Sequence, residues 1–333
     1  MTEFRGLDVG DQGFGGMALA EVYGPADEAS ALATLHHAVD AGIRLIDTAD
    51  VYGTGSNERL VGRLLRERRR RDELVVATKF GFVSDPAPDA PRFRGDPAYV
   101  REAVTASLTR LGTDRIDLYY YHRVDARVPI EETVGALAEL VDEGLVDRIG
   151  LSEVTAAELE RAHAVHPITA VQSEWSIWSR DVEHHVVPTA ARLGVGFVAY
   201  SPLGRGFLAA PVAELPEGDL RRNFPRFEAE RLAANAPIGE TVRAVAHDEG
   251  VTPAQLALAW IAERGRALGI PVVPIPSTRR AERVDENLAA VGIRLSAAAL
   301  AALEPLGGLV VGDRARYARD ISQGRERDAE AVR

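Results

Sequence analysis

Short apolar runs alternate with longer segments of helical period along nearly the whole chain, and few folds accommodate this alternation. The runs are rich in Val, Ile and Tyr and are continuously apolar, which is typical of parallel strands buried on both faces. Start and stop signals for helices lie between them, such as Ser56 and Gly112. Strands are predicted at residues 13–19, 43–48, 74–80, 116–122, 146–152, 168–174, 194–201 and 272–277.

Helical segments separate these strands and one more follows the last of them. They are predicted at residues 27–42, 56–70, 96–112, 129–144, 155–166, 179–194, 237–250, 252–265 and 279–292. Eight strand–helix units of this size fit the α/β class and, within it, a (β/α)8 TIM barrel of ~250 residues with insertions. The alternative is a doubly wound open sheet, which binds a dinucleotide through GxGxxG after its first strand. The nearest stretch, GFGG at residues 13–16, has neither that spacing nor the later acidic residue.

No linker or change of composition divides the chain, so residues 1–333 are predicted to form a single domain. Two irregular stretches, 84–97 and 202–237, follow the third and seventh strands and are interpreted as long loops at the C-terminal mouth of the barrel. Loops of that length are usually functional. The residues after Gly312 are rich in Arg, Asp and Glu, so 313–333 is expected to be a solvated, flexible tail.

The composition excludes several classes of function. The chain has 39 Lys and Arg against 50 Asp and Glu, and the net charge of −11 argues against binding to nucleic acid or an anionic membrane. It has no cysteine, which rules out disulfides, thiolate metal sites and cysteine nucleophiles, and no other metal site is predicted. The N-terminus lacks the apolar stretch of a signal peptide and no window reaches the ~18 apolar residues of a membrane span, so we expect a cytoplasmic protein.

Titratable residues occupy the carboxyl ends of three consecutive predicted strands. Asp47 ends the second strand, Lys79 lies near the end of the third and His122 ends the fourth. Tyr52 lies in the loop after Asp47. Taken singly, Asp47 fits a turn residue, Tyr52 a surface aromatic and His122 a core histidine, whereas a lysine in an apolar strand needs a partner. The carboxyl ends of barrel strands meet at one mouth, where such enzymes carry out their chemistry, so together the four predict a site.

These four side chains can protonate an oxyanion. A positive charge beside Tyr52 favours the phenolate, so Lys79 is expected to lower the pKa of Tyr52 from ~10 toward the working pH. Asp47 supplies the counter-ion that a partly buried ammonium needs, and His122 can hydrogen-bond the same substrate oxygen. No side chain can donate a hydride, so a reduction at this site implies a nicotinamide cofactor.

Six phrases of the sequence occur in an order that resembles the aldo-keto reductase family over almost the whole chain: IDTADVYG, ATKFGF, GLSE, VQSEWS, AYSPLGRGFL and IPSTRRAERVDENL. The phrases HRVD and YSPLGRGFL are shared with particular branches of that family. The resemblance implies a (β/α)8 barrel, NADPH bound extended at the C-terminal mouth, and reduction of an aldehyde or ketone to the alcohol. It also implies a tetrad in which Tyr52 is the general acid, Lys79 and Asp47 tune it, and His122 orients the carbonyl.

The same resemblance implies which residues hold NADPH. Ser152 and Gln172 would hydrogen-bond the carboxamide and Tyr200 would stack on the nicotinamide ring. The further contacts it implies are Met17; Ser201, Leu203 and Arg205 at the pyrophosphate; Ser277, Thr278, Arg279 and Arg283 at the adenosine 2′-phosphate; and Glu286 and Asn287 at the adenine. Guanidinium groups beside a helix start suit a 2′-phosphate, which favours NADP(H) over NAD(H). The alternative interpretation of this arginine run is a solvated helix face.

The sequence departs from the family pattern at two places. Many relatives have Asn after the serine of the fifth strand, whereas this chain has Glu153, so a weaker carboxamide contact is expected. Relatives also have an N-terminal hairpin that plugs the barrel floor. The corresponding segment, 1–10, is short here, so a less well covered floor is expected.

Two other functions remain open at this level. A protein that keeps the cofactor and tetrad can be an NADPH-binding redox sensor or regulatory protein with little turnover, as channel-associated relatives are. An intact tetrad disfavours this alternative without removing it. A barrel glycosidase would need paired carboxylates at two strand ends, and Asp47 with Glu153 or Glu174 is the only candidate set.

The substrate pocket is expected to be formed mainly by the two long loops. Phe82, Arg123 and Trp178 are predicted to line it, and Arg123 points to a carbonyl compound with an anionic or polar group. Pyridoxal, small aldehydes and ketones are all compatible partners. The physiological substrate, the direction of the reaction and the oligomeric state stay open.

Overall fold

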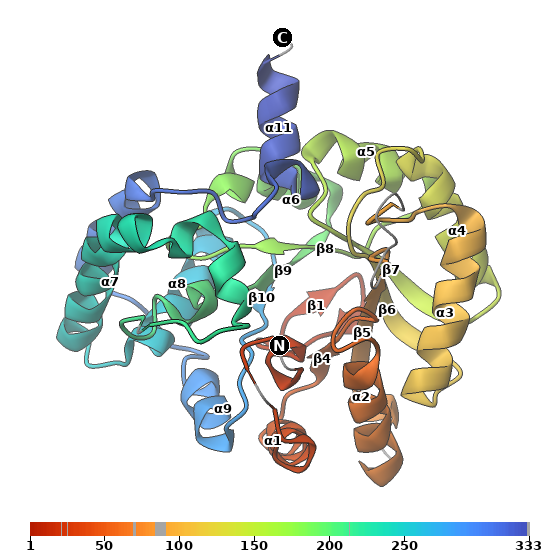
Figure 1. Ribbon diagram of the computed structural model, residues 1–333, viewed down its shortest axis with the longest axis horizontal. Coiled ribbons are helices and arrows are strands. Elements are labelled where there is room, and N and C mark those ends of the chain that lie inside the picture. Colours follow the sequence, from red (N-terminus) through yellow and green to blue (C-terminus); the bar gives the residue numbers. More distant parts are fainter. Residues whose placement is uncertain (21, 25, 69–70, 84–90, 213, 332–333) are drawn as a thin grey trace.

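The structure is a computed structural model that describes residues 1–20, 22–24, 26–68, 71–83, 91–212 and 214–331. At its centre lies a sheet of eight parallel strands, in which each strand pairs with its neighbour in the sequence (Figure 1). All eight predicted strands are present, and the α/β barrel prediction is confirmed. The strands are β3 (Phe14–Gly15), β4 (Leu45–Asp47), β5 (Val75–Phe80), β6 (Ile116–Tyr121), β7 (Val146–Ser152), β8 (Ala170–Glu174), β9 (Gly196–Tyr200) and β10 (Val272–Pro274).

Backbone hydrogen bonds join the first and last strands of this sheet. The amide of Gly13 donates to the Pro274 carbonyl at 3.0 Å, and the amide of Gly15 donates to the Pro276 carbonyl at 3.1 Å. Glycine is needed for this approach, because a Cβ on Gly15 would lie 2.7 Å from the Ile275 carbonyl oxygen. These bonds close the curled sheet into a barrel.

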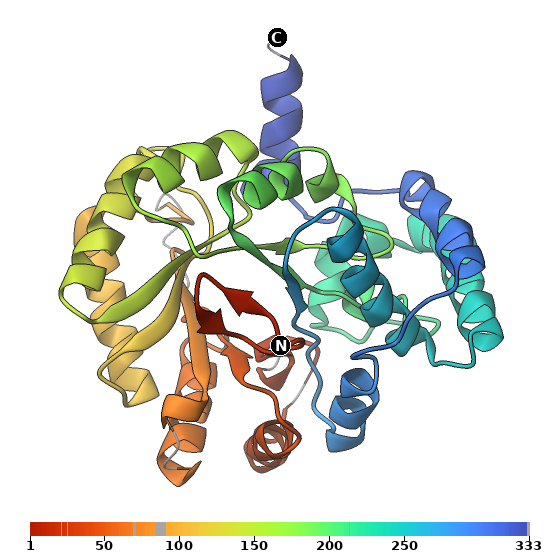
Figure 2. The ribbon, with the colours of Figure 1, turned by 180° about the vertical axis from the view of Figure 1, so that it is seen from behind.

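Helices surround the barrel on its outer side (Figure 2). Those that follow the strands are α1 (Glu28–Asp40), α2 (Ser56–Arg68), α3 (Pro97–Leu111), α4 (Ile130–Asp142), α5 (Ala156–Val165), α6 (Val186–Leu193), α7 (Ala229–Asp248), α8 (Pro253–Ala267) and α9 (Ala281–Leu288). The predicted signals hold at their ends, since Ser56 begins α2 and Gly112 ends α3 with a φ of 64°. Within the described ranges, no helix is long and apolar enough to cross a membrane.

Part of the long loop predicted at 202–237 is helical. Helix α7 begins at Ala229, eight residues before the predicted start at Pro237, and the proline lies inside it. Proline usually marks a first helical turn, which is why the sequence suggested a later start. Two helices were not predicted, α10 (Ala297–Leu303) and α11 (Ser322–Ala331). The other predicted loop, 84–97, lies partly outside the described residues.

Alternation along the strands divides the core into an inner and an outer layer. On β6, Tyr119 and Tyr121 belong to the outer layer between the sheet and the helices, whereas Tyr120 belongs to the inner layer. The inner layer consists of Phe4, Val9, Leu45, Val75, Ala77, Leu118, Tyr120, Ala170, Val198, Val273 and Ile275. The same alternation carries the next inward-facing positions toward the mouth.

The N-terminal hairpin, β1 (Glu3–Phe4) and β2 (Leu7–Asp8), covers the barrel floor in spite of its shortness. Phe4 is 1% exposed and belongs to the inner core layer. A Cβ on Gly196 would lie 2.1 Å from the Phe4 ring, so the ring fills the space that the glycine leaves. The short hairpin therefore covers the floor with one buried aromatic side chain, and the expectation that this floor is less well covered than in relatives stays a prediction.

The residues after Gly312 differ from the solvated tail that the sequence suggested. Arg314, Ile321 and Ser322 are all buried, and only the following helix, α11, projects from the body of the protein (Figures 1 and 2). The charged composition suggested exposure to solvent, but the first arginine of the segment, Arg314, is buried because it neutralises a buried carboxylate, as described below. The flexibility of the segment stays a prediction.

Candidate active site

Strand alternation brings the predicted catalytic residues to the mouth of the barrel. On β4 the inward positions are Leu45 and then Asp47, and on β5 the inward series of Val75 and Ala77 leads to Lys79. His122 continues the inward series of β6, and its amide donates to the Phe80 carbonyl at 2.8 Å. At the carboxyl ends of β4, β5 and β6, polar residues therefore take the inward-facing positions that apolar residues occupy deeper in the barrel.

Lys79 and Asp47 form a buried ion pair. The Lys79 ammonium contacts Asp47 Oδ1 and donates to the Thr48 carbonyl at 2.7 Å. The second carboxylate oxygen, Oδ2, accepts from Gln172 Nε2 at 2.8 Å. Burial lowers the pKa of the Lys79 ammonium, but Asp47 and Tyr52 outweigh burial and the net pKa is raised, so the lysine stays charged.

Tyr52 lies beside this charge and beside His122. The Lys79 nitrogen is 5.2 Å from the centroid of the Tyr52 ring, and the Tyr52 and His122 rings meet edge to face at 6.1 Å. The loop that presents Tyr52 turns back through Gly53 and Gly55, whose φ angles of 56° and 80° favour glycine. Asp47 at the end of β4 and Tyr52 in the loop that follows therefore both reach the mouth, and the two glycines let that loop turn back.

The expected lowering of the Tyr52 pKa is not found. Burial raises the pKa of the phenol, and this effect exceeds the opposing pull of the Lys79 charge. The prediction considered the charge of Lys79 but not the desolvation of the Tyr52 phenol where it lines the cavity. Tyr52 is consequently a protonated group, held beside a cation that stabilises its conjugate base.

His122 is neutral at this mouth. Burial, with help from the Arg123 and Lys79 charges, holds its pKa well below the ordinary value. Its Nδ1 is buried and has no hydrogen-bond partner among the residues that the structure describes. Phe82 packs edge to face on the imidazole at 4.8 Å between ring centroids. A neutral, aromatically packed imidazole is a hydrogen-bonding group of fixed orientation rather than a cation.

A cavity of about 730 Å³ opens at the same mouth. Thirteen of the residues predicted to act in catalysis or binding line it: Met17, Asp47, Tyr52, Phe82, His122, Arg123, Ser152, Gln172, Tyr200, Ser201, Leu203, Arg205 and Ser277. They come from opposite sides of the barrel, from the loop after β3 to the end of β10. Lys79 is buried and is not part of the lining.

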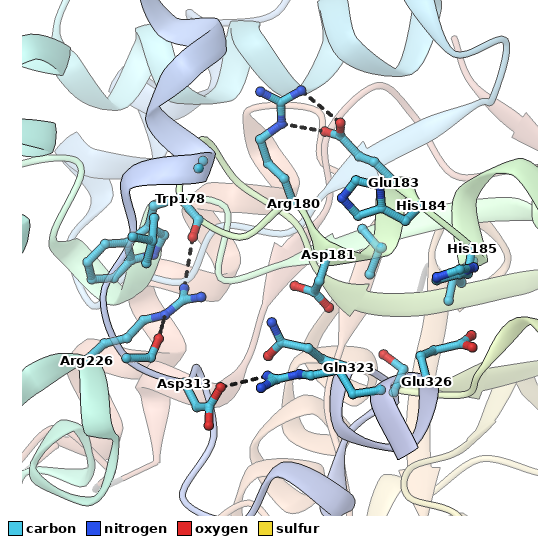
Figure 3. Close-up of a pocket in the computed structure, with 18 of the residues that line it drawn as sticks. Trp178, Arg180, Asp181, Glu183, His184, His185, Arg226, Asp313, Gln323 and Glu326 are labelled. Carbon is cyan, nitrogen blue, oxygen red and sulfur yellow. Dashed lines mark hydrogen bonds and ion pairs between the residues drawn. The ribbon is translucent and has the colours of Figure 1, made fainter. Parts of the chain in front are cut away.

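Trp178 does not line this cavity, contrary to the prediction that it forms a substrate wall. Its ring is 2% exposed and stacks on Phe207 at 3.9 Å between centroids, with Phe227 packed against it edge to face. The segment after β8 turns away from the mouth and buries the indole against residues of the following loop and 3-10 helix. The Arg226 guanidinium lies over the indole at 5.2 Å from its centroid, and both residues line a second cavity, shown in Figure 3.

The residues predicted for the adenosine end cluster at the start of α9, beyond the cavity lining. Arg279 donates to the carbonyls of Ala18, at 2.7 Å, and Gly24, at 2.9 Å, and so ties this end of β10 to the loop after β3. Arg283 forms an ion pair with Glu286. Thr278 accepts from the Arg280 amide, and Asn287 is buried. Ser277 is the member of this group that reaches the cavity.

Glu153, the residue that departs from the family pattern, is not among the residues that line the cavity. The weaker carboxamide contact expected from it stays a prediction. The Glu153 carboxylate pairs with Arg314 at 2.7 Å and accepts from the Tyr200 hydroxyl at 2.7 Å. Sequence reasoning missed Arg314 altogether. The available signal was the charge of Glu153 itself, since a carboxylate that ends an apolar strand needs a cation.

This geometry removes the paired carboxylates that a glycosidase needs. Asp47 is committed to Lys79 and Gln172, and Glu153 is committed to Arg314. Glu174, the other candidate, is buried, accepts from Ser179 Oγ at 2.7 Å and is not among the residues that line the cavity. Burial of Glu153 is outweighed by the Arg314 charge, which holds its pKa well below the usual range and keeps it from acting as an acid. In the described part of the chain, no group of three or more His, Asp or Glu gathers as it would around a metal ion.

A closed (β/α)8 barrel with a polar tetrad at its C-terminal mouth is the architecture of a TIM-barrel enzyme. Residues 12–307 match the family model described as the aldo/keto reductase family. The chain belongs to the aldo-keto reductase family. This membership indicates an oxidoreductase that acts on small carbonyl compounds with a nicotinamide cofactor.

Two solved structures resemble the chain over nearly its whole length. The glycerol dehydrogenase AKR11B4 from Gluconobacter oxydans is 27% identical with a TM-score of 0.81, and the match covers 94% of this chain and 96% of that one. The thermostable aldo-keto reductase Tm1743, solved in complex with the inhibitor epalrestat, is 29% identical with a TM-score of 0.70. That match covers 90% of this chain and 96% of the other.

Proposed function

We propose that the protein reduces an aldehyde or ketone to the alcohol with NADPH, and that Tyr52 supplies the proton. The arrangement of the mouth carries this proposal. Tyr52, His122 and Asp47 line one cavity, while Lys79 is buried with its nitrogen 5.2 Å from the centre of the Tyr52 ring. A neutral acid and a neutral hydrogen-bonding imidazole share the cavity, and a cation lies beside the acid, which suits protonation of an oxyanion.

The residues of the cavity fit a nicotinamide nucleotide. Tyr200 offers a flat ring, and Ser152 and Gln172 offer polar groups at the ends of neighbouring strands. Ser201 and Arg205 continue the lining along the loop after β9, where the Arg205 guanidinium can face a phosphate. Bound there, NADPH would supply the hydride that adds to the carbonyl carbon.

The side chains of the chain account for the proton. As negative charge develops on the substrate oxygen, the Tyr52 O–H bond breaks and its proton moves to that oxygen, which completes the alcohol. The phenolate left behind is stabilised by Lys79, whose charge Asp47 balances. Burial keeps Tyr52 protonated until this moment, and His122 donates a hydrogen bond that orients the carbonyl.

The preference for NADPH over NADH is assigned to the start of α9. Arg279 and Arg283 lie near Ser277, and guanidinium groups at a helix start recognise a 2′-phosphate well. Arg283 is partly exposed and pairs with Glu286, so it can rearrange at small cost. Arg279 is held by backbone carbonyls and supports the site mainly by fixing its shape.

The substrate is proposed to bind against Phe82 and Arg123, whose side chains pack together with the guanidinium 5.5 Å from the centre of the ring. Arg123 donates to the His122 carbonyl at 2.6 Å and to Ser152 Oγ at 3.1 Å, and it has no acidic partner within the described ranges. A guanidinium that lines the cavity without an acidic partner favours a carbonyl compound with an anionic or hydroxyl group. The relative AKR11B4 is a glycerol dehydrogenase, so glyceraldehyde belongs among the compounds to test.

The proposal is tested by NADPH oxidation, followed by absorbance, with aromatic and aliphatic aldehydes, glyceraldehyde and pyridoxal. We expect turnover that falls by about 10²–10⁴-fold in Tyr52→Phe. The matched control is Tyr119→Phe, which removes a hydroxyl from the outer core layer of β6. Tight NADPH binding with no turnover on any compound would instead favour the redox-sensor function. Equal activity in Tyr52→Phe and wild type would remove Tyr52 as the acid.

A further inference from the structure

Glu153 is an unusual residue for its position. It follows the last residue of β7, its side chain is fully buried, and its φ of 53° lies in the left-handed region that non-glycine residues rarely adopt. A buried charge in a strained backbone conformation persists only where its surroundings hold it there. The contacts of the carboxylate show what those surroundings are.

Both oxygens of the Glu153 carboxylate are bound by the C-terminal segment. Arg314 forms a two-pronged pair with it, at 2.7 Å from Nη1 to Oε1 and 2.9 Å from Nη2 to Oε2. Ser322 donates to Oε2 from its amide, at 3.1 Å, and from its hydroxyl, at 3.0 Å. Oε1 also accepts the Tyr200 hydroxyl, and Arg314 contacts Asp181 at 2.9 Å. One carboxylate therefore binds both ends of residues 314–322 and the edge of Tyr200.

The attachment continues along the chain on both sides. Arg325 donates to the Glu153 carbonyl at 2.5 Å and pairs with Glu158 at 2.9 Å. Glu326 accepts from the Ala156 amide at 2.6 Å. The start of α11 is thus tied to the turn between β7 and α5, so the whole segment is docked rather than loosely packed.

Between its two attachments the segment forms one wall of the catalytic cavity. Residues 314–317, 320 and 321 belong to the same lining as Tyr52 and His122. A second fixed point faces them from the loop after β5, where Arg92 pairs with Asp320 at 2.7 Å and stacks on Tyr317 at 4.8 Å. The position of this wall therefore depends on Glu153, which binds the segment but does not line the cavity.

We propose that Glu153 is a positioning residue that, through Arg314, holds residues 314–322 as the substrate-facing wall of the active site and fixes the Tyr200 ring. This inference rests on the proposed function for its effect on substrate. Glu153 touches neither the reacting groups nor the cavity, so its influence passes through the wall. Loss of the pair leaves one charge buried and uncompensated, which releases the segment from its dock.

The test compares Arg314→Met with Arg327→Met in the full-length protein. Arg327 is also an arginine of the C-terminal segment, and it forms an exposed pair with Asp313 at 2.7 Å, without contact to Glu153 in the described part of the chain. For Arg314→Met we expect the KM of the best aldehyde to rise by about tenfold or more, with a changed order of preference across the panel. We expect kcat and the NADPH dissociation constant to change by less than about threefold. Arg327→Met should match wild type.

Hydrogen exchange provides a readout that does not depend on catalysis. Amides of residues 314–331 should exchange faster in Arg314→Met and at the wild-type rate in Arg327→Met. Unchanged KM and unchanged exchange in Arg314→Met would overturn the proposal. If Arg314→Met does not fold, Ser322→Ala removes one bond to Oε2 and should shift KM and exchange in the same direction, and no shift there overturns the proposal. A wild type that reduces no carbonyl compound contradicts the proposed function, and the exchange comparison then decides the docking alone.

Discussion

The ammonium nitrogen of Lys79 lies 5.2 Å from the centroid of the Tyr52 ring, and the lysine side chain is completely buried. A lysine in such a place is tolerated because Asp47 neutralises it, and Asp47 is tolerated because Lys79 does the same. The ion pair that stabilises the Tyr52 phenolate therefore also makes the fold sensitive to the loss of either charge. Activity and stability therefore respond differently when the two charges are removed singly or together.

Lys79→Met is expected to abolish turnover and to destabilise the protein by about 3–5 kcal/mol, since it leaves the Asp47 carboxylate buried without its cation. Equilibrium unfolding in urea measures the stability. The double variant Asp47→Asn with Lys79→Met should recover much of the lost stability without recovering activity. Stabilities that simply add, or activity that returns in the double variant, would contradict this account of the pair.

Stability should depend on pH through Asp50, in the loop between Asp47 and Tyr52. Its Oδ1 is buried without a hydrogen-bond partner among the described residues, and burial, together with the Glu58 charge, raises its pKa from 3.8 to about 7. The folded protein therefore binds this proton more tightly than the unfolded chain does. The contribution to stability is fully present below about pH 4 and is lost as the pH rises through about 7.

The variant Asp50→Asn carries a neutral amide that does not titrate, so it resembles the protonated form of Asp50 at every pH. Between about pH 5 and pH 8 its stability should rise relative to wild type by roughly 2–3 kcal/mol. Urea unfolding at several pH values measures the difference, with the exposed Asp142→Asn as control. A difference between Asp50→Asn and wild type that stays constant over this pH range would show that Asp50 does not titrate there.

The nucleotide preference should change at Arg283. If its guanidinium exchanges Glu286 for a 2′-phosphate, Arg283→Met will raise the dissociation constant for NADPH by about 10- to 100-fold and leave that for NADH nearly unchanged. Quenching of protein fluorescence reports both constants. Arg294→Met, an exposed arginine paired with Glu263, serves as the control. Equal weakening of both nucleotides would place the 2′-phosphate elsewhere.

The barrel floor should behave as a stability element that is separate from catalysis. Phe4→Ala is expected to cost about 3 kcal/mol, because it empties the space against Gly196, while kcat stays within about twofold of wild type. Gly196→Ala should also destabilise, since its methyl group would lie 2.1 Å from the Phe4 ring. In the double variant the methyl group meets no ring, so the combined loss should be smaller than the sum of the two. Additive losses would mean that Phe4 does not fill this space.

The strands were predictable because parallel barrel strands are apolar on both faces, and a polar residue at the end of such a run is conspicuous. Asp47, Lys79 and His122 were located in this way, and eleven other residues of the predicted set line the same cavity as Asp47 and His122. The pKa of Tyr52 was predicted in the wrong direction, since sequence spacing reveals a neighbouring charge but not the depth at which a ring is buried.

The C-terminal segment was missed for a different physical reason. Its arginines and acids have the composition of a solvated tail, and only the fold shows that Arg314 meets the carboxylate of Glu153. The two are far apart in the sequence, so no local pattern links them. Trp178 shows the converse, because its sequence position near a strand end gives no information on the direction in which the following segment turns.

Residues 314–322 follow all eight strands in the sequence, which gives the docked wall a consequence for biosynthesis. A ribosome releases the strands of the barrel, including the turn that holds Glu153, before it releases Arg314. A nascent barrel thus carries a carboxylate in its wall with no arginine to neutralise it. Because a lone carboxylate is costly to bury, we expect the turn after β7 to reach its final conformation only after residues 314–322 have left the ribosome.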